Sequence, residues 1–176
     1  CTPSRGLGDV YKRQIKDNVL SLVNVLPKDM KLLGIDLGTK TIGLAISDPY
    51  LRVASAIMTL KRSKLKKNLP EISHIASEFN VGGIVMGLPI NMDGTLSARA
   101  QATKDWAFSL TEIFNMPIAF WDERLSTAAV ERAMISADVS RKKRARQVDA
   151  AAATYILQGA LDFIQFNAAN RPMKKE

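Results

Sequence analysis

The stretch "LLGIDLGTKTIGLAISD", Leu32–Asp48, carries one carboxylate, Asp36, near the end of an apolar run. A Gly-Thr-Lys turn follows at residues 38–40, and a second apolar run begins at Thr41. This pattern predicts two strands joined as an antiparallel hairpin. Strand interiors normally exclude Asp, because burying an ionised carboxylate is costly unless a partner compensates it. Asp36 therefore either caps the turn or belongs to a functional site.

Apolar periodicity extends the hairpin into an α/β pattern. We expect strands over residues 31–37, 41–47, 52–60, 83–86 and 117–121. We expect helices over 68–79, with Asn68 as the cap, and over 96–114, 127–137 and 147–166. Three strands joined by short turns, followed by alternating helices and strands, predict a five-stranded mixed sheet with flanking helices. Right-handed crossovers place strand 31–37 at its centre.

The chain before Lys31 differs from the rest. Residues 1–14 show no regular period, and "GDVYKRQ" within them resembles a translated sequencing adapter, so we expect a non-native tail there. Apolar residues over 15–30 recur at helical spacing and predict a helical extension. The main domain is then expected to span residues 31–166, with a flexible tail over 167–176.

Composition restricts the class of protein. The 176 residues, 47% of them hydrophobic, suit one domain with a sizeable core. There are 25 Lys and Arg residues against 17 Asp and Glu, and this net charge of +8 favours polyanionic partners. The one Cys lies in the expected tail, which fits a reducing cytoplasm. No apolar run approaches the ~20 residues of a membrane span, so we expect a cytoplasmic protein without a membrane partner.

Further acids are expected at the sheet edge where Asp36 lies. Asp122 and Glu123 follow the last predicted strand, and spacing does not choose between them. Asp149 shares a predicted helix face with Ala152, Ala153, Ile156, Ala160 and Ile164. Each acid alone could be a turn cap, a solvated strand end or a partner of the helix dipole. Open α/β sheets, however, bind ligands at the carboxyl ends of their strands. Clustered carboxylates there would bind Mg²⁺ or Mn²⁺, the ions of phosphodiester chemistry.

Four blocks of the sequence, in order, resemble the YqgF family, also called RuvX or Holliday-junction-resolvase-like proteins. The blocks are "GIDLGTKTIGLAISD", "GLPINMDGTLSARA", "DERLSTAAVE" and "KKRARQVDAAAATYILQGALD", and they cover about residues 31–162. The resemblance implies a ribonuclease H-like fold and a nuclease that matures the 5′ end of pre-16S rRNA. It also implies that Asp36, Glu123 and Asp149 are the catalytic, metal-binding acids, and it favours Glu123 over Asp122.

Several basic and polar residues near these blocks are candidate nucleic-acid contacts. They are Lys40, Asn91, Arg99, Arg124, Arg141, Lys142, Lys143, Arg144 and Arg146. The run over 141–146 could equally be a solvated face, and the loop around Asn91 could simply form turns. Aromatic residues are scarce near the site, with Phe120 and Trp121 expected in the core. We therefore expect recognition of backbone and shape more than base stacking.

Other interpretations remain open at this point. The Asp36 hairpin also resembles the phosphate loop of actin, sugar-kinase and Hsp70 ATPases, but those proteins need two lobes and this length allows one. A non-catalytic RNA-binding assembly factor would gain nothing from three acids. The sequence does not choose between structured pre-16S rRNA and a branched DNA such as a Holliday junction. A junction resolvase would act as a homodimer, although no exposed apolar stripe indicates a dimer face.

Overall fold

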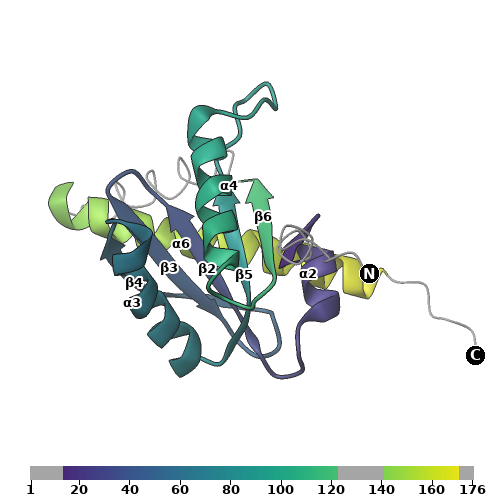
Figure 1. Cartoon of the computed structure of the whole chain (residues 1–176). Helices are drawn as coiled ribbons and strands as arrows, with labels where there is room; N and C mark the ends of the chain where they lie inside the picture. The colour runs from purple at the N-terminus through teal and green to yellow at the C-terminus, as the bar shows by residue number, and fades with distance from the viewer. Residues whose placement is uncertain (1–13, 123–140, 171–176) are drawn as a thin grey trace, which may run out of the picture.

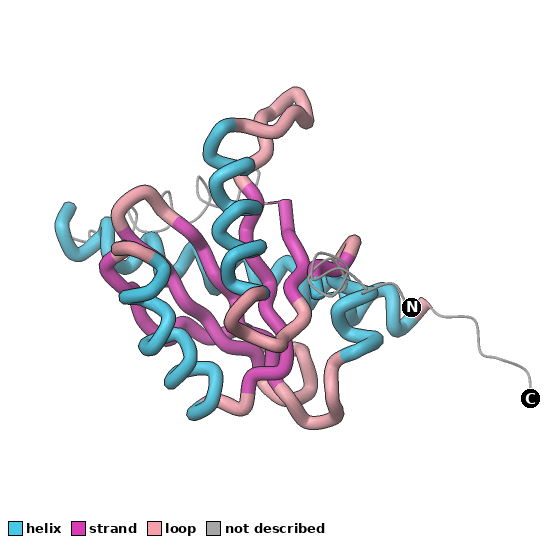
Figure 2. Tube along the Cα trace, viewed as in Figure 1, coloured by secondary structure: helices cyan, strands magenta, loops and turns pink. Residues whose placement is uncertain are grey.

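The fold is one twisted sheet with helices on both faces (Figures 1 and 2). It comes from a computed structural model that describes residues 14–122 and 141–170, with only the backbone described for 141–149. Helices α3 (Leu65–Glu78) and α4 (Ala98–Thr111) cover one face. Helices α2 (Val19–Val25) and α6 (Arg141–Ala169) cover the other. None of the helices in this part of the chain combines the length and apolarity that a membrane span requires.

The order of the strands follows the predicted topology. Strands β2 (Lys31–Leu37), β3 (Thr41–Ser47) and β4 (Ala54–Lys61) form an antiparallel meander. Strand β5 (Val81–Leu88) lies parallel to β2, and β6 (Ile118–Asp122) lies parallel to β5. The carboxyl ends of β2, β5 and β6 therefore meet at one edge of the sheet, and β2 has neighbours on both sides.

The sheet has six strands, so the prediction of five was wrong. The additional strand is β1, Ile15–Lys16, which pairs in parallel with β6 at Ile118 and Ala119. These residues were predicted to be helical. The helix instead begins at Val19, because the side chain of Asn18 accepts a hydrogen bond from the backbone N–H of Ser21 at 2.9 Å and caps it there.

Helix α3 begins at Leu65, one turn before the predicted start at Asn68. Asn68 is 3% exposed and does not cap the helix. Its amide nitrogen donates to the carbonyl oxygen of Lys61 at 2.9 Å, and its amide oxygen accepts from the backbone N–H of Ser63 at 2.8 Å. A buried amide must satisfy its polar atoms, and this one does so by joining α3 to the end of β4.

Helix α6 begins at Arg141, so the basic run predicted to separate two helices is helical backbone instead. The predicted apolar stripe is confirmed by burial of Ala152, Ala153, Ile156, Ala160 and Ile164. Helix α4 likewise buries Ala100, Trp106 and Leu110 as predicted, whereas Ile113 is 53% exposed beyond its end. The helix predicted over 127–137 lies outside the described residues.

Small residues on β2 and its neighbours let α6 approach the sheet closely. A Cβ atom on Gly34 would lie 2.8 Å from the Cβ of Leu157 and 3.2 Å from the carbonyl oxygen of Ala153. Gly34 is paired with Ala45 on one side and Val85 on the other, and both pack beneath α6. The helix therefore rests almost directly on the backbone of β2.

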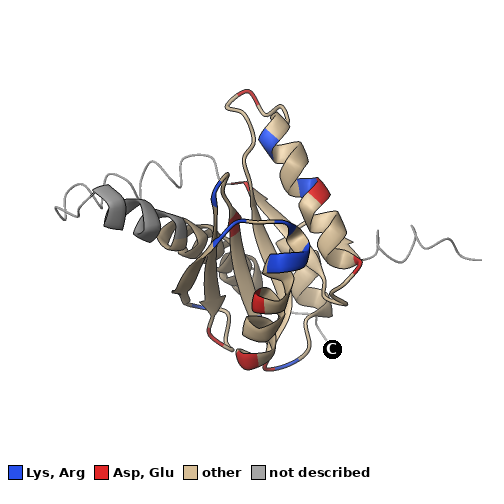
Figure 3. Cartoon of the chain, turned by 60° about the vertical axis from the view of Figure 1, so that its left-hand side comes forward, with Lys and Arg blue, Asp and Glu red and all other residues tan. Residues whose placement is uncertain are grey.

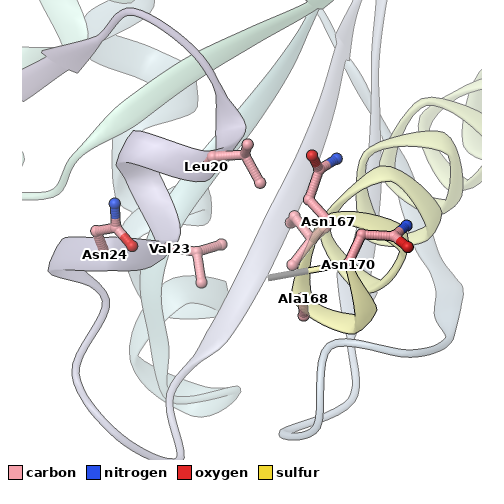
Figure 4. Close-up of a pocket in the computed structure, with 7 residues that line it drawn as sticks. Leu20, Val23, Asn24, Asn167, Ala168 and Asn170 are labelled. Atoms are coloured by element: carbon pink, nitrogen blue, oxygen red, sulfur yellow. The ribbon is translucent and has the colours of Figure 1, made fainter. Parts of the chain in front are cut away.

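Helix α2 packs on the C-terminal part of α6 through the buried side chains of Val19 and Leu22. Between the two helices lies a pocket of about 440 Å³ (Figure 4). Its lining is part apolar and part amide, from Leu20, Val23, Asn24, Ile164, Asn167, Ala168 and Asn170. This pocket is at the opposite end of α6 from Asp149, a separation of roughly 30 Å at 1.5 Å per residue.

Candidate functional site

Asp36 is a buried carboxylate, 7% exposed, at the carboxyl end of the central strand β2. On one side it pairs with Gly43 of β3. On the other side, one residue beyond the pair Ile35–Met86, lies Gly87 of β5. Neither glycine has a side chain, so these two positions place no side chain beside Asp36. The sheet thus fixes the backbone of Asp36 from both sides.

Strand alternation places Asp36 on the face of the sheet that α6 covers. Leu32 packs beneath α6, and Gly34 contacts its backbone, so Asp36 follows them on the same face. Asp149 is one turn before Ala153, the residue whose carbonyl passes over Gly34. One turn is about 5.4 Å. The backbone of α6 therefore brings Asp149 to the same face as Asp36. For Asp149, the structure describes the backbone alone.

Asp122, the acid that the sequence left as an alternative to Glu123, ends β6 on the other face. Phe120, two residues earlier, packs with the core beneath α3 and α4, whereas Trp121 packs with the cluster beneath α6. Alternation assigns Asp122 to the side of Phe120, away from the face that Asp36 uses. This argues against Asp122 as the partner of Asp36. Glu123 itself lies outside the described residues.

The two aromatic residues expected in the core are both partly buried, on opposite faces of the sheet. Phe120 packs against the core beneath α3 and α4, and Trp121 packs against the cluster beneath α6. The Trp121 ring lies against Gly159 of α6 and meets the ring of Phe163 at a centroid distance of 5.6 Å. Trp121 therefore helps to fix α6 against the edge of the sheet where the acids are expected.

The hairpin after Asp36 is held by Arg62, a residue that the sequence analysis did not select. The backbone N–H of Gly38 donates to the carbonyl oxygen of Thr41 at 2.9 Å, which closes the turn. The Arg62 guanidinium donates to the carbonyl oxygen of Gly38 at 2.6 Å. The backbone N–H of Arg62 donates to the carbonyl oxygen of Lys40 at 2.9 Å. Arg62 thus binds both ends of the turn. Lys40 is exposed at its tip.

The loop between β5 and α4 rises beyond the carboxyl ends of the strands (Figure 1). Asn91 is exposed there, and its amide nitrogen donates to the hydroxyl of Thr95 at 3.0 Å. The Thr95 hydroxyl and backbone N–H both donate to Asp93, and these bonds hold the pKa of Asp93 below its ordinary value. The loop is therefore closed by its own hydrogen bonds. A phosphate contact by Asn91 stays a prediction.

Helix α4 begins directly after this loop. The hydroxyl of Ser97 donates to the carbonyl oxygen of Pro89 at 2.8 Å and accepts from the backbone N–H of Ala100 at 2.9 Å. Ser97 therefore caps α4 and anchors the loop at once. Arg99 follows in the first turn and is exposed at the same edge as Lys40.

Among the residues with described side chains, no three of the types His, Cys, Asp and Glu lie close enough to hold a metal ion. Of the three predicted acids, only Asp36 has a described side chain. The one histidine, His74, is exposed on α3, with its Nε2 3.7 Å from Oε2 of Glu78. Arg124 lies outside the described residues, and the run Arg141–Arg146 is described as helical backbone alone.

A second group of cations, none of them among the predicted nucleic-acid contacts, gathers near the edge. Lys61 ends β4, and Lys64, Lys66 and Lys67 lie at the start of α3, all of them exposed. Figure 3 shows Lys and Arg, in blue, gathered where the chain enters this helix. Because β4 runs parallel to β2, these lysines share the edge with Asp36. The segment "KRSKLKK", residues 61–67, was the available signal, with five cations in seven residues.

Comparison with known proteins identifies relatives over most of the chain. Residues 30–163 match the family model described as RuvX, Holliday junction resolvase. A protein of Cereibacter sphaeroides is 47% identical over 148 residues, which are 84% of this chain and 92% of that protein. A protein of Chelativorans sp. is 53% identical over 134 residues, which are 76% and 84% of the two chains. Both relatives bear the name "Putative pre-16S rRNA nuclease".

The architecture matches a solved resolvase. The structure of Thermus thermophilus RuvC in complex with a Holliday junction substrate aligns over 80% of this chain and 96% of that chain. The TM-score is 0.51 and the sequence identity is 17%, so the likeness concerns the fold alone. The predicted ribonuclease H-like fold is confirmed, with one strand more than expected.

Proposed function

The chain belongs to the RuvX family, and on that basis we propose that it is a metal-dependent nuclease that processes the 5′ end of pre-16S rRNA during ribosome biogenesis. The observation that carries this proposal is the buried carboxylate of Asp36 at the carboxyl end of the central strand. The acid lies on the face to which α6 brings Asp149. The names of the relatives at about half identity support RNA as the substrate. Maturation of rRNA would place the protein in the cytoplasm.

The residues at this edge fit a hard divalent cation. Asp36, Glu123 and Asp149 would supply carboxylate oxygens, the donors that Mg²⁺ and Mn²⁺ prefer. The flanking residues 43 and 87 are glycines and place no side chain beside the first of these carboxylates. A bound ion would lower the pKa of a water molecule and stabilise charge on the phosphate. The contribution of the chain is to fix Asp36 within the sheet, so that its carboxylate needs no rearrangement to act as a ligand.

Exposed cations at the same edge support a polyanionic substrate. Lys40 and Arg99 are exposed there, and the Arg141–Arg146 run begins the helix that carries Asp149. We propose that these residues, with Asn91 and Arg124, contact phosphates and position the strand without reading its bases.

A branched DNA is the second candidate substrate, because the family description itself reads Holliday junction resolvase. A resolvase must cut two strands symmetrically, and this function would require a homodimer. A role as a binding factor without catalysis is the third interpretation, and the buried Asp36 counts against it. Pure RNA binding gains nothing from a carboxylate beside a phosphate.

One assay separates these functions. A labelled RNA spanning the 5′ end of pre-16S rRNA and a labelled four-way DNA junction are each incubated with Mg²⁺, Mn²⁺ or EDTA. We expect cleavage of the RNA with either metal and none with EDTA. Symmetric cleavage of the junction alone would establish a resolvase. Binding of RNA without cleavage under any condition would establish an assembly factor. In cells depleted of the protein, unprocessed 5′ ends of 16S rRNA should accumulate.

A further inference from the structure

Four lysines on the α3 side of the sheet form an exposed basic surface: Lys61, Lys64, Lys66 and Lys67, here called the α3-side lysines. None of them makes an ion pair with another described residue. Lys61 pairs through its backbone with Thr41, the first residue of β3 and the first after the turn at residues 38–40. It is therefore two strands, about 10 Å, from β2.

Buried contacts hold this surface in place. Asn68 accepts from the backbone N–H of Ser63 at 2.8 Å and donates to the carbonyl oxygen of Lys61 at 2.9 Å, which fixes the segment to α3. Arg62, within the segment, donates to the carbonyl oxygens of Gly38 and Lys40 and fixes it to the hairpin. The positions of the lysine backbones relative to Asp36 are thus set by hydrogen bonds at both ends of the segment.

The charges of these lysines do not serve the stability of α3. Lys64 is the N-cap residue and makes no capping bond with its side chain, and Lys66 and Lys67 occupy the first turn. The first turn contains no acidic residue. Positive charge at a helix N-terminus opposes the helix dipole and is unfavourable for folding. A cluster that costs stability and makes no ion pair with another described residue is suited to binding an anion.

We propose that the α3-side lysines are a second phosphate-binding surface, which holds the RNA strand on the side of the sheet opposite to α6. The strand then crosses the edge at Asp36, between these lysines and the basic run that begins α6. It follows that the substrate extends beyond the cleaved bond in both directions, so that cleavage is internal. This inference rests on the proposed nuclease function, because the edge at Asp36 is taken as the place of cleavage.

The test compares two double variants that lose the same charge. Lys66→Ala with Lys67→Ala removes two α3-side lysines. Lys28→Ala with Arg52→Ala removes two exposed cations near the opposite edge of the sheet. Binding of labelled pre-16S RNA is measured in EDTA at several salt concentrations, so that no turnover is needed. Each lost phosphate contact should lower the salt slope by roughly 0.7 on a single strand. We expect a slope lower by about 1.4 for the first pair and an unchanged slope for the second.

Thermal unfolding and truncated RNAs complete the test. The Lys66→Ala, Lys67→Ala variant should unfold at the same temperature as the parent or a higher one, since charge that opposes the α3 dipole is removed. An RNA shortened on the side of the cleavage site that the α3-side lysines hold should bind parent and variant equally. An RNA shortened on the other side should still bind the parent more tightly than the variant. An unchanged slope in the first variant would overturn the proposal, and so would a difference that persists with both truncations.

These measurements are independent of catalysis. If wild-type protein binds RNA with the expected slopes but never cleaves it, the nuclease function fails while the binding surface stands. If RNA is cleaved and the slopes of both variants equal that of the parent, the binding surface fails while the nuclease function stands.

Discussion

Gly34 of β2 and Leu157 of α6 lie so close that a Cβ atom on residue 34 would be 2.8 Å from the Cβ of Leu157. The carbonyl oxygen of Ala153 would be 3.2 Å from the same atom. The contact sets where α6 crosses the central strand, about one to two turns after Asp149 on the helix and two residues before Asp36 on the strand. The absence of a side chain at residue 34 therefore controls the spacing between two of the proposed acids.

Substitution Gly34→Ala should displace α6 from the sheet. Overpacking of this kind costs about 1–3 kcal/mol, and we expect that loss in the free energy of unfolding measured with urea. Cleavage should fall with it, because Asp149 moves with α6. The matched control is Gly83→Ala, where the new Cβ would meet the terminal Cδ2 methyl of Leu32 at 3.0 Å, an atom that can rotate away. Equal stability of the two variants would show that α6 does not depend on this contact.

Much of the fold could be predicted from residue pattern, because strand and helix periods were strong where packing was strongest. The continuous apolar runs around Asp36 gave β2 and β3, and the stripe from Ala152 to Ile164 gave the buried face of α6. The central place of β2 followed from connection rules alone. These elements bury nearly every apolar residue that defined them.

The errors lie where local capping competes with periodicity. Asn68 has the residue type of a helix cap, yet it lies within the first turns of α3. Its buried amide hydrogen-bonds there to the backbone of Lys61 and Ser63, which precede the helix. At the other end of the chain, Asn18 does cap a helix, and the backbone before it pairs with β6 instead of continuing the apolar helical period. Such choices depend on tertiary partners that the local pattern does not contain.

The site was predicted unevenly for a related reason. Asp36 stood out because an acid within an apolar run is rare, whereas Arg62 was hidden in a basic segment. Its role depends on two carbonyl oxygens, of Gly38 and Lys40, that come close only when β4 pairs with β3. Glu123 and Arg124 lie outside the described residues, so their assignment still rests on the resemblance to the family.

Arg62→Ala should loosen the hairpin that follows Asp36. The lost bond from the guanidinium to the carbonyl oxygen of Gly38 is charge-assisted and partly buried, and its removal should cost about 1–2 kcal/mol in urea unfolding. We expect the single-turnover cleavage rate at saturating RNA to fall more than the affinity does. Arg62→Lys should restore part of the rate. Arg52→Ala, an exposed arginine near the opposite edge, is the control. An affinity loss with an unchanged rate would make Arg62 a phosphate contact instead.

Asp48 should make stability depend on pH. Burial alone would raise the pKa of this carboxyl, but the backbone N–H groups of Val53, Arg52 and Tyr50 donate to it and together hold its pKa below the ordinary value. A carboxyl whose pKa is lower in the folded than in the unfolded state stabilises the fold at pH values above the unfolded-state pKa of about 3.9. That contribution is lost as the pH falls through the folded-state pKa.

Asp48→Asn should therefore destabilise the protein at neutral pH, by about 1 kcal/mol. The difference from the parent should shrink as pH falls below about 4. Urea unfolding across this pH range checks the prediction, with the exposed Asp17→Asn as the control. A difference that stays constant down to the lowest pH would mean that the ionised form of Asp48 contributes nothing.

The three proposed acids make the strongest prediction about chemistry. Asp36→Asn, Glu123→Gln and Asp149→Asn each remove a metal-ligand charge, so each should lower Mg²⁺-dependent cleavage by orders of magnitude. Relief of repulsion between carboxylates should leave the unfolding temperature unchanged or higher. Asp122→Asn is the matched control, because alternation along β6 assigns Asp122 to the opposite face of the sheet from Asp36.

The most direct single measurement is the single-turnover cleavage rate of a labelled pre-16S RNA by Asp36→Asn and Asp122→Asn, side by side, at saturating protein and in Mg²⁺. We predict that Asp122→Asn cleaves at nearly the wild-type rate. Asp36→Asn should bind the RNA and leave it intact. Normal cleavage by Asp36→Asn would contradict the central claim that the buried carboxylate of the central strand is the catalytic one.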